Sequence, residues 1–344
     1  MGCAIVPPYL LLRIAELEDP ALAEAAAAAR HALLHDIPFR SVRSVGVAVP
    51  DEPPRAAGLE RTIFTADHTE VLPGRIVRQE GDLPTGDDAT DEAYDGFGYS
   101  YDFFDTVYSR ASIDGNDFAL HATVHYGDAY DNAFWDGQRL VLGDGDGQIF
   151  NRFTSSLSVI GHELTHGMTQ YTTNLIYQGQ SGALNESISD VFGSLIEQYA
   201  ANQATDVASW LIGEGLFTDL VQGSAIRSLK APGTAFDDDV IGKDPQPAHM
   251  SDYMMTENDS GGVHLNSGIP NHAFYLVAAA LGGFAWERAG RIWYDTITAG
   301  VVAADADFAA FSQATNECAS DRFGADSAEH RAVTQAWEAV GVTS

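Results

Sequence analysis

Residues 157–170 read LSVIGHELTHGMTQ, and this stretch decides how the whole chain is interpreted. Its apolar residues are spaced by three and four positions, which predicts a helix with one buried face. They are Leu157, Ile160, Leu164 and Met168. His162 and His166 are four positions apart, so one face of that helix would present both imidazoles to a single metal ion.

Glu163 directly follows the first of these histidines. From there it would reach a water molecule on the ion without being a natural ligand itself. This is the pattern of zinc hydrolases, in which the ion lowers the pKa of its water and the glutamate accepts the proton. The alternative is a helix with two surface histidines, because so short a motif also arises by chance.

Residues 184–199 repeat the apolar spacing, which predicts a second helix one short loop downstream. Glu186 on this helix would complete a catalytic zinc site, which has three protein ligands and one open position. Asn185 and Asp190 flank it as supporting residues, and Asp190 would accept the outer N–H of a ligating histidine. The alternative, a solvated helix face, is disfavoured by the apolar residues around them.

The remaining sequence predicts an α+β fold. Short apolar runs separated by Gly and Asp turns predict strands in the first half of the chain. These runs are residues 61–66, 74–79, 121–127 and 139–145. Residues 93–109 favour a helix, because Tyr94, Phe97 and Tyr101 recur at helical spacing. Further helices are expected at residues 269–281, 290–301 and 329–341.

We divide the chain into three parts. These are a leader with its linker (residues 1–55), a β-rich part (56–155) and a helical part (156–344). Asp19 before Pro20 signals the start of a helix in the leader, and the alanine-rich residues that follow favour it. Residues 50–58, PDEPPRAAG, are typical of an exposed linker or cleavage segment.

The 344 residues include 49 Asp and Glu against 18 Lys and Arg, a formal charge of -31 at pH 7. Nucleic acid and anionic membranes both attract clustered Lys and Arg, so we expect neither as a partner. No apolar run reaches the length of about 18 residues that a membrane span needs. The amino terminus lacks the pattern of a signal peptide, so we expect a cytoplasmic precursor or secretion by a non-standard route.

Several long motifs together resemble the thermolysin-like zinc metalloendopeptidases. The resemblance begins in residues 162–200, which contain the histidines and the acids predicted to bind the metal, and it extends over nearly all of residues 61–344. The other matching motifs are YDGFGYSYDFF (94–104), YDNAFWDGQRLVLGDGDGQIF (130–150), AIRSL (225–229) and SGGVHLNSGIPN (260–271). The leader, with IVPPYLLLRIAE (5–16), is similar to the short prosegment of the protealysin-like subgroup.

This resemblance implies a role for each matching residue in the hydrolysis of internal peptide bonds. A β-rich and a helical domain would enclose a cleft that holds the zinc. The zinc ligands would be His162, His166 and Glu186, with Glu163 as general base. His264 and Tyr177 would donate to the oxyanion that forms on the attacked carbonyl, and Asp259 would keep His264 protonated.

The resemblance also implies how a protein or peptide substrate is held. Asn132 and the carbonyl of Ala133 would hold the substrate main chain, and Arg227 would bind the carbonyl after the cleaved bond. The pocket for the next side chain would be apolar, which favours a bulky hydrophobic residue on the amine side of the cut. Its lining would be Phe150, Phe153, Val159 and Ile226.

Two further sites are expected, a calcium site and a zinc contact from the leader. Glu197 and Glu214 match acidic ligands of the family's calcium site, but Ser158 replaces a usual Asp, so calcium would bind more weakly or as one ion instead of two. Cys3 in the leader would offer a thiolate to the zinc, since thiolate is a strong zinc ligand. The alternative is a leader that aids folding or covers the cleft while Cys3 takes no part.

Two rival functions remain open at this stage. A zinc aminopeptidase shares the His-Glu-x-x-His motif and a downstream Glu, but the amine-binding Gly-x-Met-Glu-Asn motif is absent from this sequence. A latent, non-catalytic precursor would bind a partner through its leader. The presence of Glu163, His264 and Tyr177 disfavours this second rival.

Overall fold

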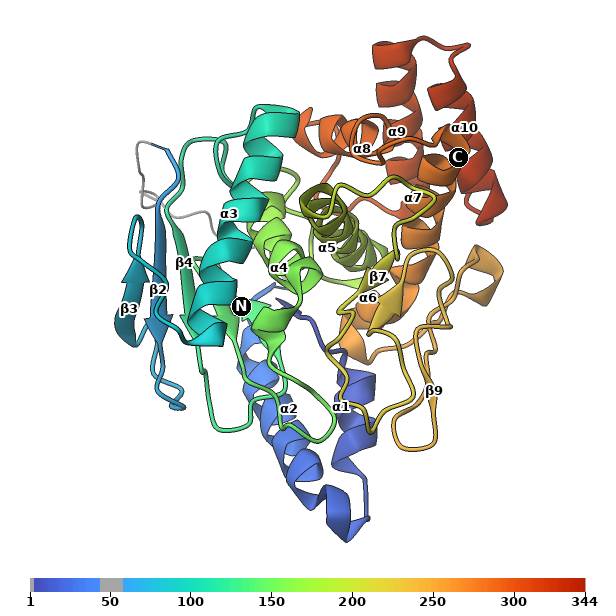
Figure 1. Ribbon diagram of the computed structural model, residues 1–344. Coiled ribbons are helices and arrows are strands. Elements are labelled where there is room, and N and C mark those ends of the chain that lie inside the picture. Colours follow the sequence, from blue (N-terminus) through green and yellow to red (C-terminus); the bar gives the residue numbers. More distant parts are fainter. Residues whose placement is uncertain (1–2, 44–57, 344) are drawn as a thin grey trace.

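The computed structural model describes residues 3–43 and 58–343, except for the side chains of Cys3 and of residues 36–43. We call residues 3–43 the N-terminal segment. Most of the predicted linker lies outside the described residues. The predicted α+β class is confirmed: a sheet lies on one side and a group of helices on the other (Figure 1).

The sheet is mixed and has six strands in the order β1-β5-β6-β4-β2-β3. The strands are β1 (Cys3–Ala4), β2 (Arg61–Thr65), β3 (Arg75–Gln79), β4 (Leu120–Val124), β5 (Ala133–Trp135) and β6 (Leu140–Leu142). Strands β2, β4 and β6 run parallel, whereas β3, β5 and β1 pair antiparallel with their neighbours. All four predicted strand runs are confirmed; β1 and β5 were not predicted.

The predicted helix near residue 93 is α3 (Asp88–Tyr108), which Asp87 caps by accepting the N–H of Thr90 at 2.8 Å. Seven further α-helices among the described residues follow the sheet along the chain. They are α4 (Leu157–Gln170), α5 (Gly179–Ala200), α6 (Asp259–Asn266), α7 (Gly268–Leu281), α8 (Ala289–Thr298), α9 (Phe308–Phe323) and α10 (Ala328–Ala339). Two pairs of short antiparallel strands lie between α5 and α6. They are β7 (Leu211–Ile212) with β8 (Arg227–Ser228) and β9 (Asp237–Asp238) with β10 (Gly242–Lys243).

The N-terminal segment forms a helical hairpin of α1 (Pro8–Ala15) and α2 (Ala23–Arg43), seen in blue at the bottom of Figure 1. The predicted helix start is confirmed, since the side chain of Asp19 accepts the N–H of Ala21 at 2.9 Å. Ahead of the hairpin, β1 adds an edge strand to the sheet beside β5. Ile5 and Val6 are completely buried there, so the segment packs into the body of the molecule.

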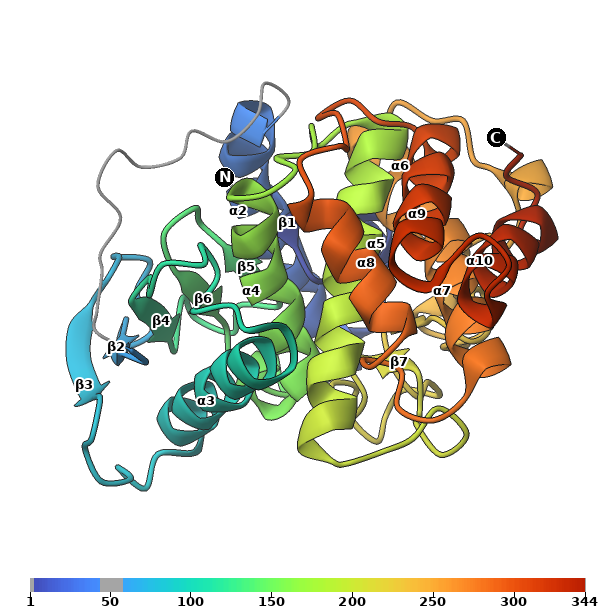
Figure 2. The same cartoon turned by 90° about the horizontal axis from the view of Figure 1, so that it is seen from above.

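Helix α4 lies between the sheet and α5 (Figure 2). Two glycines allow α4 and α5 to approach closely. A Cβ atom at Gly193 would lie 2.5 Å from the carbonyl oxygen of Ser158, and one at Gly161 would lie 3.0 Å from Cα of Gly193. The close approach brings the histidines of α4 next to the acids of α5.

Candidate metal and catalytic site

The inner nitrogens of the α4 histidines face one carboxylate of α5. Nε2 of His162 lies 3.0 Å from Nε2 of His166, and each lies 3.6 Å from an oxygen of Glu186. All three side chains are buried. Ligands on one zinc ion at about 2.0–2.1 Å stand roughly 3.3–3.5 Å apart, so this donor set fits zinc after shifts of a few tenths of an ångström.

The outer nitrogens of the same histidines are bound to side chains of α5. Nδ1 of His162 lies 2.8 Å from the carboxylate of Asp190, and Nδ1 of His166 lies 2.8 Å from Oδ1 of Asn185 and 3.0 Å from the hydroxyl of Ser189. An acceptor at Nδ1 holds its proton there and leaves the lone pair on Nε2 for a metal. Ser189 carried no signal in the sequence beyond its place on the helix.

A buried charge network surrounds these supporting contacts. Arg227 donates to Asp190 through Nε at 2.9 Å and Nη2 at 2.8 Å, and Asn271 donates to it at 2.8 Å. Burial by itself would raise the pKa of Asp190, but Arg227 and His162 lower it to about 2. Burial opposes the charge of Glu186 too, yet the nearby imidazoles hold its pKa far below the usual range. Both acids are therefore anionic at neutral pH.

Glu163 lies beside β5, the second strand of the sheet. Its carboxylate accepts the backbone N–H of Trp135 on β5 at 2.9 Å, and the side chain is completely buried. Sequence reasoning missed Trp135, because a main-chain donor gives no sequence signal.

The predicted oxyanion donors face the same site from α6 and from the loop before α5. Nε2 of His264 lies 3.3 Å from the hydroxyl of Tyr177 and 3.5 Å from Glu186. Nδ1 of His264 lies 2.7 Å from Asp259. Burial would lower the pKa of His264, but the charges of Asp259 and Glu186 raise it. The hydroxyl of Tyr177 here donates to Glu186.

The residues predicted to hold a substrate main chain contact the N-terminal segment instead. The carbonyl of Ala133 accepts the N–H of Ile5 at 3.0 Å, and Oδ1 of Asn132 accepts the N–H of Val6 at 2.9 Å. Arg227 donates to the carbonyl of Ile5 at 2.9 Å. Nε2 of His264 lies 3.1 Å from the carbonyl oxygen of Ala4, so residues 4–6 lie against the site as an extended strand.

The predicted apolar pocket residues are all completely buried. They are Phe150, Phe153, Val159 and Ile226. The rings of Phe150 and Phe153 lie 5.7 Å apart, centroid to centroid. The assignment of these four side chains to a substrate pocket stays a prediction.

The remaining predicted sites are less complete. Burial and the charge of Glu214 raise the pKa of Glu197, whose carboxylate also contacts the hydroxyl of Ser158. Neither glutamate belongs to any of the three clusters of His and acidic side chains among the described residues whose spacing could hold a metal ion. The calcium site therefore stays a prediction. The proposed zinc contact of Cys3 involves a side chain outside the described residues.

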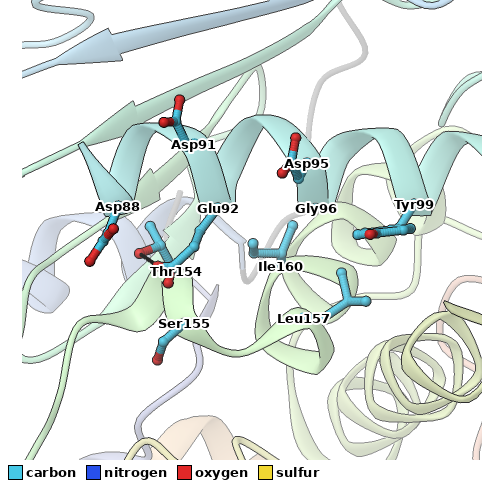
Figure 3. A pocket seen from close by; sticks show the side chains of 10 residues that line it. All are labelled: Asp88, Asp91, Glu92, Asp95, Gly96, Tyr99, Thr154, Ser155, Leu157 and Ile160. Carbon is cyan, nitrogen blue, oxygen red and sulfur yellow. Dashed lines mark hydrogen bonds between the residues drawn. The ribbon is translucent and has the colours of Figure 1, made fainter. Parts of the chain in front are cut away.

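A separate surface pocket lies between α3 and the start of α4 and is rich in carboxylates (Figure 3). Its acids already have partners. Glu92 binds Arg152 at 2.6 Å and accepts from Thr154 at 2.7 Å, and Asp91 binds Arg78 at 2.9 Å. Through Glu92, these contacts join α3 to the residues just ahead of α4.

Comparison with known proteins agrees with this geometry. Residues 65–170 match the family model of the thermolysin metallopeptidase catalytic domain, and residues 173–342 match that of the thermolysin metallopeptidase alpha-helical domain. The chain belongs to the thermolysin metallopeptidase family. This confirms the resemblance inferred from the motifs.

Individual relatives of this thermolysin-family chain support the same conclusion. An extracellular metalloprotease of Pectobacterium carotovorum subsp. carotovorum is 49% identical over 346 residues, which cover 99% of this chain and 96% of that protein. A thermolysin of Alicyclobacillus acidocaldarius subsp. acidocaldarius is 39% identical over 81% of this chain but only 51% of its own length. The solved precursor of protealysin from Serratia proteamaculans covers 99% of both chains at 48% identity, with a TM-score of 0.89.

The match to a protealysin precursor confirms the subgroup predicted from the leader. The thermolysin-family chain is thus a metalloendopeptidase, and zinc is the metal of its family. No helix among the described residues is long and apolar enough to span a membrane.

Proposed function

We propose that His162, His166 and Glu186 hold the zinc of this endopeptidase and that Glu163 is its general base. The observation that carries this proposal is the convergence of two imidazole nitrogens and a carboxylate, 3.0–3.6 Å apart, in a buried position. When bound, zinc lowers the pKa of a water molecule and polarises the peptide carbonyl. The site residues supply the orientation and the proton transfers.

Glu163 accepts a proton from the attacking water and later delivers it to the departing amine. Trp135, donating its N–H at 2.9 Å, fixes the direction of that carboxylate. His264 carries a proton toward the cleft because Asp259 binds its other nitrogen at 2.7 Å. Its Nε2–H stabilises negative charge on the carbonyl oxygen. Removing such a donor raises the activation barrier by about 3–4 kcal/mol.

Tyr177 is the second donor to that oxygen. Its hydroxyl lies 3.3 Å from Nε2 of His264, so the two groups can bind one oxygen together. In the precursor the hydroxyl donates to Glu186. When a substrate enters the site, its carbonyl oxygen would accept this hydrogen bond in place of Glu186.

The N-terminal segment serves as an intramolecular inhibitor. Its residues 4–6 use the groups that a substrate main chain would need, namely Ala133, Asn132, Arg227 and His264. Because β1 runs antiparallel to β5, the carbonyl of Ala4 meets the oxyanion donor while that of Ile5 meets the arginine. A substrate is excluded until the segment is removed.

The carbonyl of Ala4 lies against His264, so the next residue of the segment occupies the position of the substrate residue on the amine side of the cut. In the N-terminal segment this residue is Ile5, which is completely buried. The lining proposed for this position is apolar (Phe150, Phe153, Val159 and Ile226). We infer a preference for a bulky hydrophobic residue on the amine side of the cut. Apolar pockets distinguish side chains that differ by one methylene only modestly, so several hydrophobic residues should be accepted.

Proteins and peptides are the proposed substrates, and the site of action is outside the cell. The second point follows from the relative in Pectobacterium carotovorum, which is named an extracellular metalloprotease. Cell fractionation of the natural host with an antibody to the processed enzyme tests it. Protein found only inside intact cells would contradict it.

The decisive experiment is the hydrolysis of casein by the purified protein before and after removal of the N-terminal segment. We expect activity to rise on removal and to be lost in Glu163→Ala, which removes the base. Persistent activity in that variant would overturn the mechanism. An internally quenched, amino-blocked peptide and a free-amine dipeptide separate endopeptidase from aminopeptidase, since only the former cleaves the blocked substrate.

A further inference from the structure

Two histidines of the N-terminal segment and a glutamate from the body of the molecule converge away from the cleft. His31 and His35 lie four positions apart on α2, and Glu70 lies in the loop between β2 and β3. Oε1 of Glu70 is 2.8 Å from Nε2 of His31 and 2.9 Å from Nε2 of His35. One ligand atom from each residue lies within 4.8 Å of the others.

The two rings repeat the arrangement of the histidine pair in the cleft. The centroids of His31 and His35 are 4.7 Å apart at an interplanar angle of 85°, and those of His162 and His166 have the same separation and angle. In each pair, a carboxylate from another segment faces both inner nitrogens. The arrangement of the two rings in the cleft therefore occurs a second time, here with one oxygen of Glu70 at hydrogen-bonding distance from both imidazoles.

We propose that His31, His35 and Glu70 form a second metal site, which binds a divalent transition ion such as zinc and fastens the N-terminal segment to the body of the protein. Two imidazoles and one carboxylate are a ligand set that zinc prefers. The side chains of His31, His35 and Glu70 are 36%, 25% and 40% exposed, so the ion can enter from solvent. Water can occupy its remaining position.

Neighbouring aromatic side chains orient one of the ligands. The ring of His35 makes edge contacts with Tyr126 and Tyr130, at centroid distances of 6.5 and 6.3 Å. Both tyrosines are buried in the chain between β4 and β5. The site is thus built partly on the rigid body of the molecule, as a well-defined metal site requires.

The other surface cluster, His68, His125 and Asp144, is a poorer candidate. Both ring nitrogens of His125 already bind carboxylates: Nδ1 lies 2.8 Å from Asp144 and Nε2 lies 3.1 Å from Asp87. The hydrogen bond to Asp144 raises the pKa of His125 to about 9. A metal ligand must be deprotonated, so this histidine is unsuited to hold an ion at neutral pH.

The effect of the ion on latency rests on the proposed function. The hairpin of α1 and α2 continues from the strand that covers the cleft, so an ion at Glu70 holds that strand in place. An ion present at 100 times its dissociation constant would lower the fraction of undocked segment about 100-fold. Removal of residues 1–55 takes away two of the three ligands, so processing would release the ion.

The test counts metal in the full-length precursor carrying Glu163→Ala, which prevents self-cleavage. After incubation with zinc and removal of the excess, we expect one more zinc per chain than in the same protein with His31→Ala and His35→Ala. Glu70→Gln, an exposed and conservative change, should also lose this ion. His68→Ala is the matched control from the other histidine cluster and should retain it.

Cobalt substitution gives a second readout. We expect the visible absorption of the parent to exceed that of the Glu70→Gln and double-histidine variants by the contribution of one additional site. Equal zinc content and equal spectra in parent and variants would overturn the proposal and leave a plain hydrogen-bonded contact. Neither measurement depends on proteolysis, so inactivity towards casein would contradict only the proposed function.

Discussion

At the scale of single residues, Asp190 connects His162, the proposed zinc ligand, to Arg227, which is proposed to bind substrate. Its carboxylate contacts His162, Arg227 and Asn271 in the buried interior. Because its pKa is about 2, the group remains charged at every pH at which the enzyme is expected to work. That charge orients the His162 ring and balances the buried guanidinium.

Replacing Asp190 should weaken both zinc binding and the stability of the fold. In Asp190→Asn we expect zinc affinity to fall about 10–100-fold, because the supporting acceptor loses its charge. We also expect the free energy of unfolding of the metal-free protein to fall by about 3 kcal/mol, because Arg227 is left buried without its partner. Chelator competition and urea unfolding measure the two effects. Asp237→Asn, at an exposed position on β9, is the control, and equal zinc affinity in both variants would contradict the role given to Asp190.

His125 should make the stability of the fold depend on pH. Asp144 raises its folded pKa to about 9, whereas an unfolded histidine titrates near 6.5. A raised folded pKa stabilises the protein fully below about pH 6.5, and the contribution disappears as the pH rises through about 9. His125→Asn keeps a side chain that tolerates the left-handed φ of 52° at this position. In thermal unfolding, the gap between parent and variant should be widest near pH 6 and should narrow towards pH 9; a constant gap would contradict this assignment.

The sequence revealed the pair of histidines proposed to bind zinc because its signal is local. His162 and His166 are four positions apart, and any helix would place them on one face. Trp135, Ser189 and Asn271 join the site only because β5, α5 and α7 pack around it, and their spacing in the sequence assigned them no role. Such residues become visible only when the tertiary structure is known.

At the scale of elements, the proposed inhibition depends on β1 and the residues that follow it. The strand is only two residues long, and the residues after it continue the contacts with Asn132, Ala133 and Arg227. Its attachment therefore depends on main-chain hydrogen bonds and on the burial of Ile5 and Val6. A charge placed among these buried side chains should displace the strand without touching the catalytic groups.

We expect Ile5→Asp to give a precursor that cleaves an internally quenched peptide before any processing. Burying the carboxylate costs several kcal/mol, so the segment should leave the cleft. The matched control is Leu12→Asp on α1, whose side chain is 49% exposed and should leave the latency unchanged. Initial rates, with gels to confirm an intact chain, measure the effect. A fully latent Ile5→Asp precursor would contradict inhibition by this strand.

The elements differ in how well the sequence foretold them. Strands β2, β3, β4 and β6 were predictable, because each is an apolar run that ends at turn residues. Strands β1 and β5 were missed, since they have two and three residues and pair across about 130 positions of sequence. Helix α9 was missed as well: its buried Phe308 and Phe311 are followed by small and polar residues that blur the helical period.

At the scale of the whole molecule, the acidic excess is distinct from the chemistry of the site. The acids assigned to catalysis are few and buried, namely Glu163, Glu186, Asp190 and Asp259. Carboxylates in the pocket of Figure 3 are bound to arginines or to the backbone. Most of the charge of -31 must therefore lie on solvated surface, where it repels itself and lowers the stability of the compact state.

Screening should relieve this repulsion. The Debye length falls from about 30 Å at 0.01 M salt to about 3 Å at 1 M, so the midpoint of thermal unfolding should rise with sodium chloride, most steeply below about 0.2 M. The Glu163→Ala precursor is the protein to use, because it does not digest itself. Near pH 4.4, where the net charge vanishes, the same salt series should give a much smaller rise. A midpoint that does not change with salt at pH 7, or that rises equally at both pH values, would show that surface repulsion does not limit the stability of this fold.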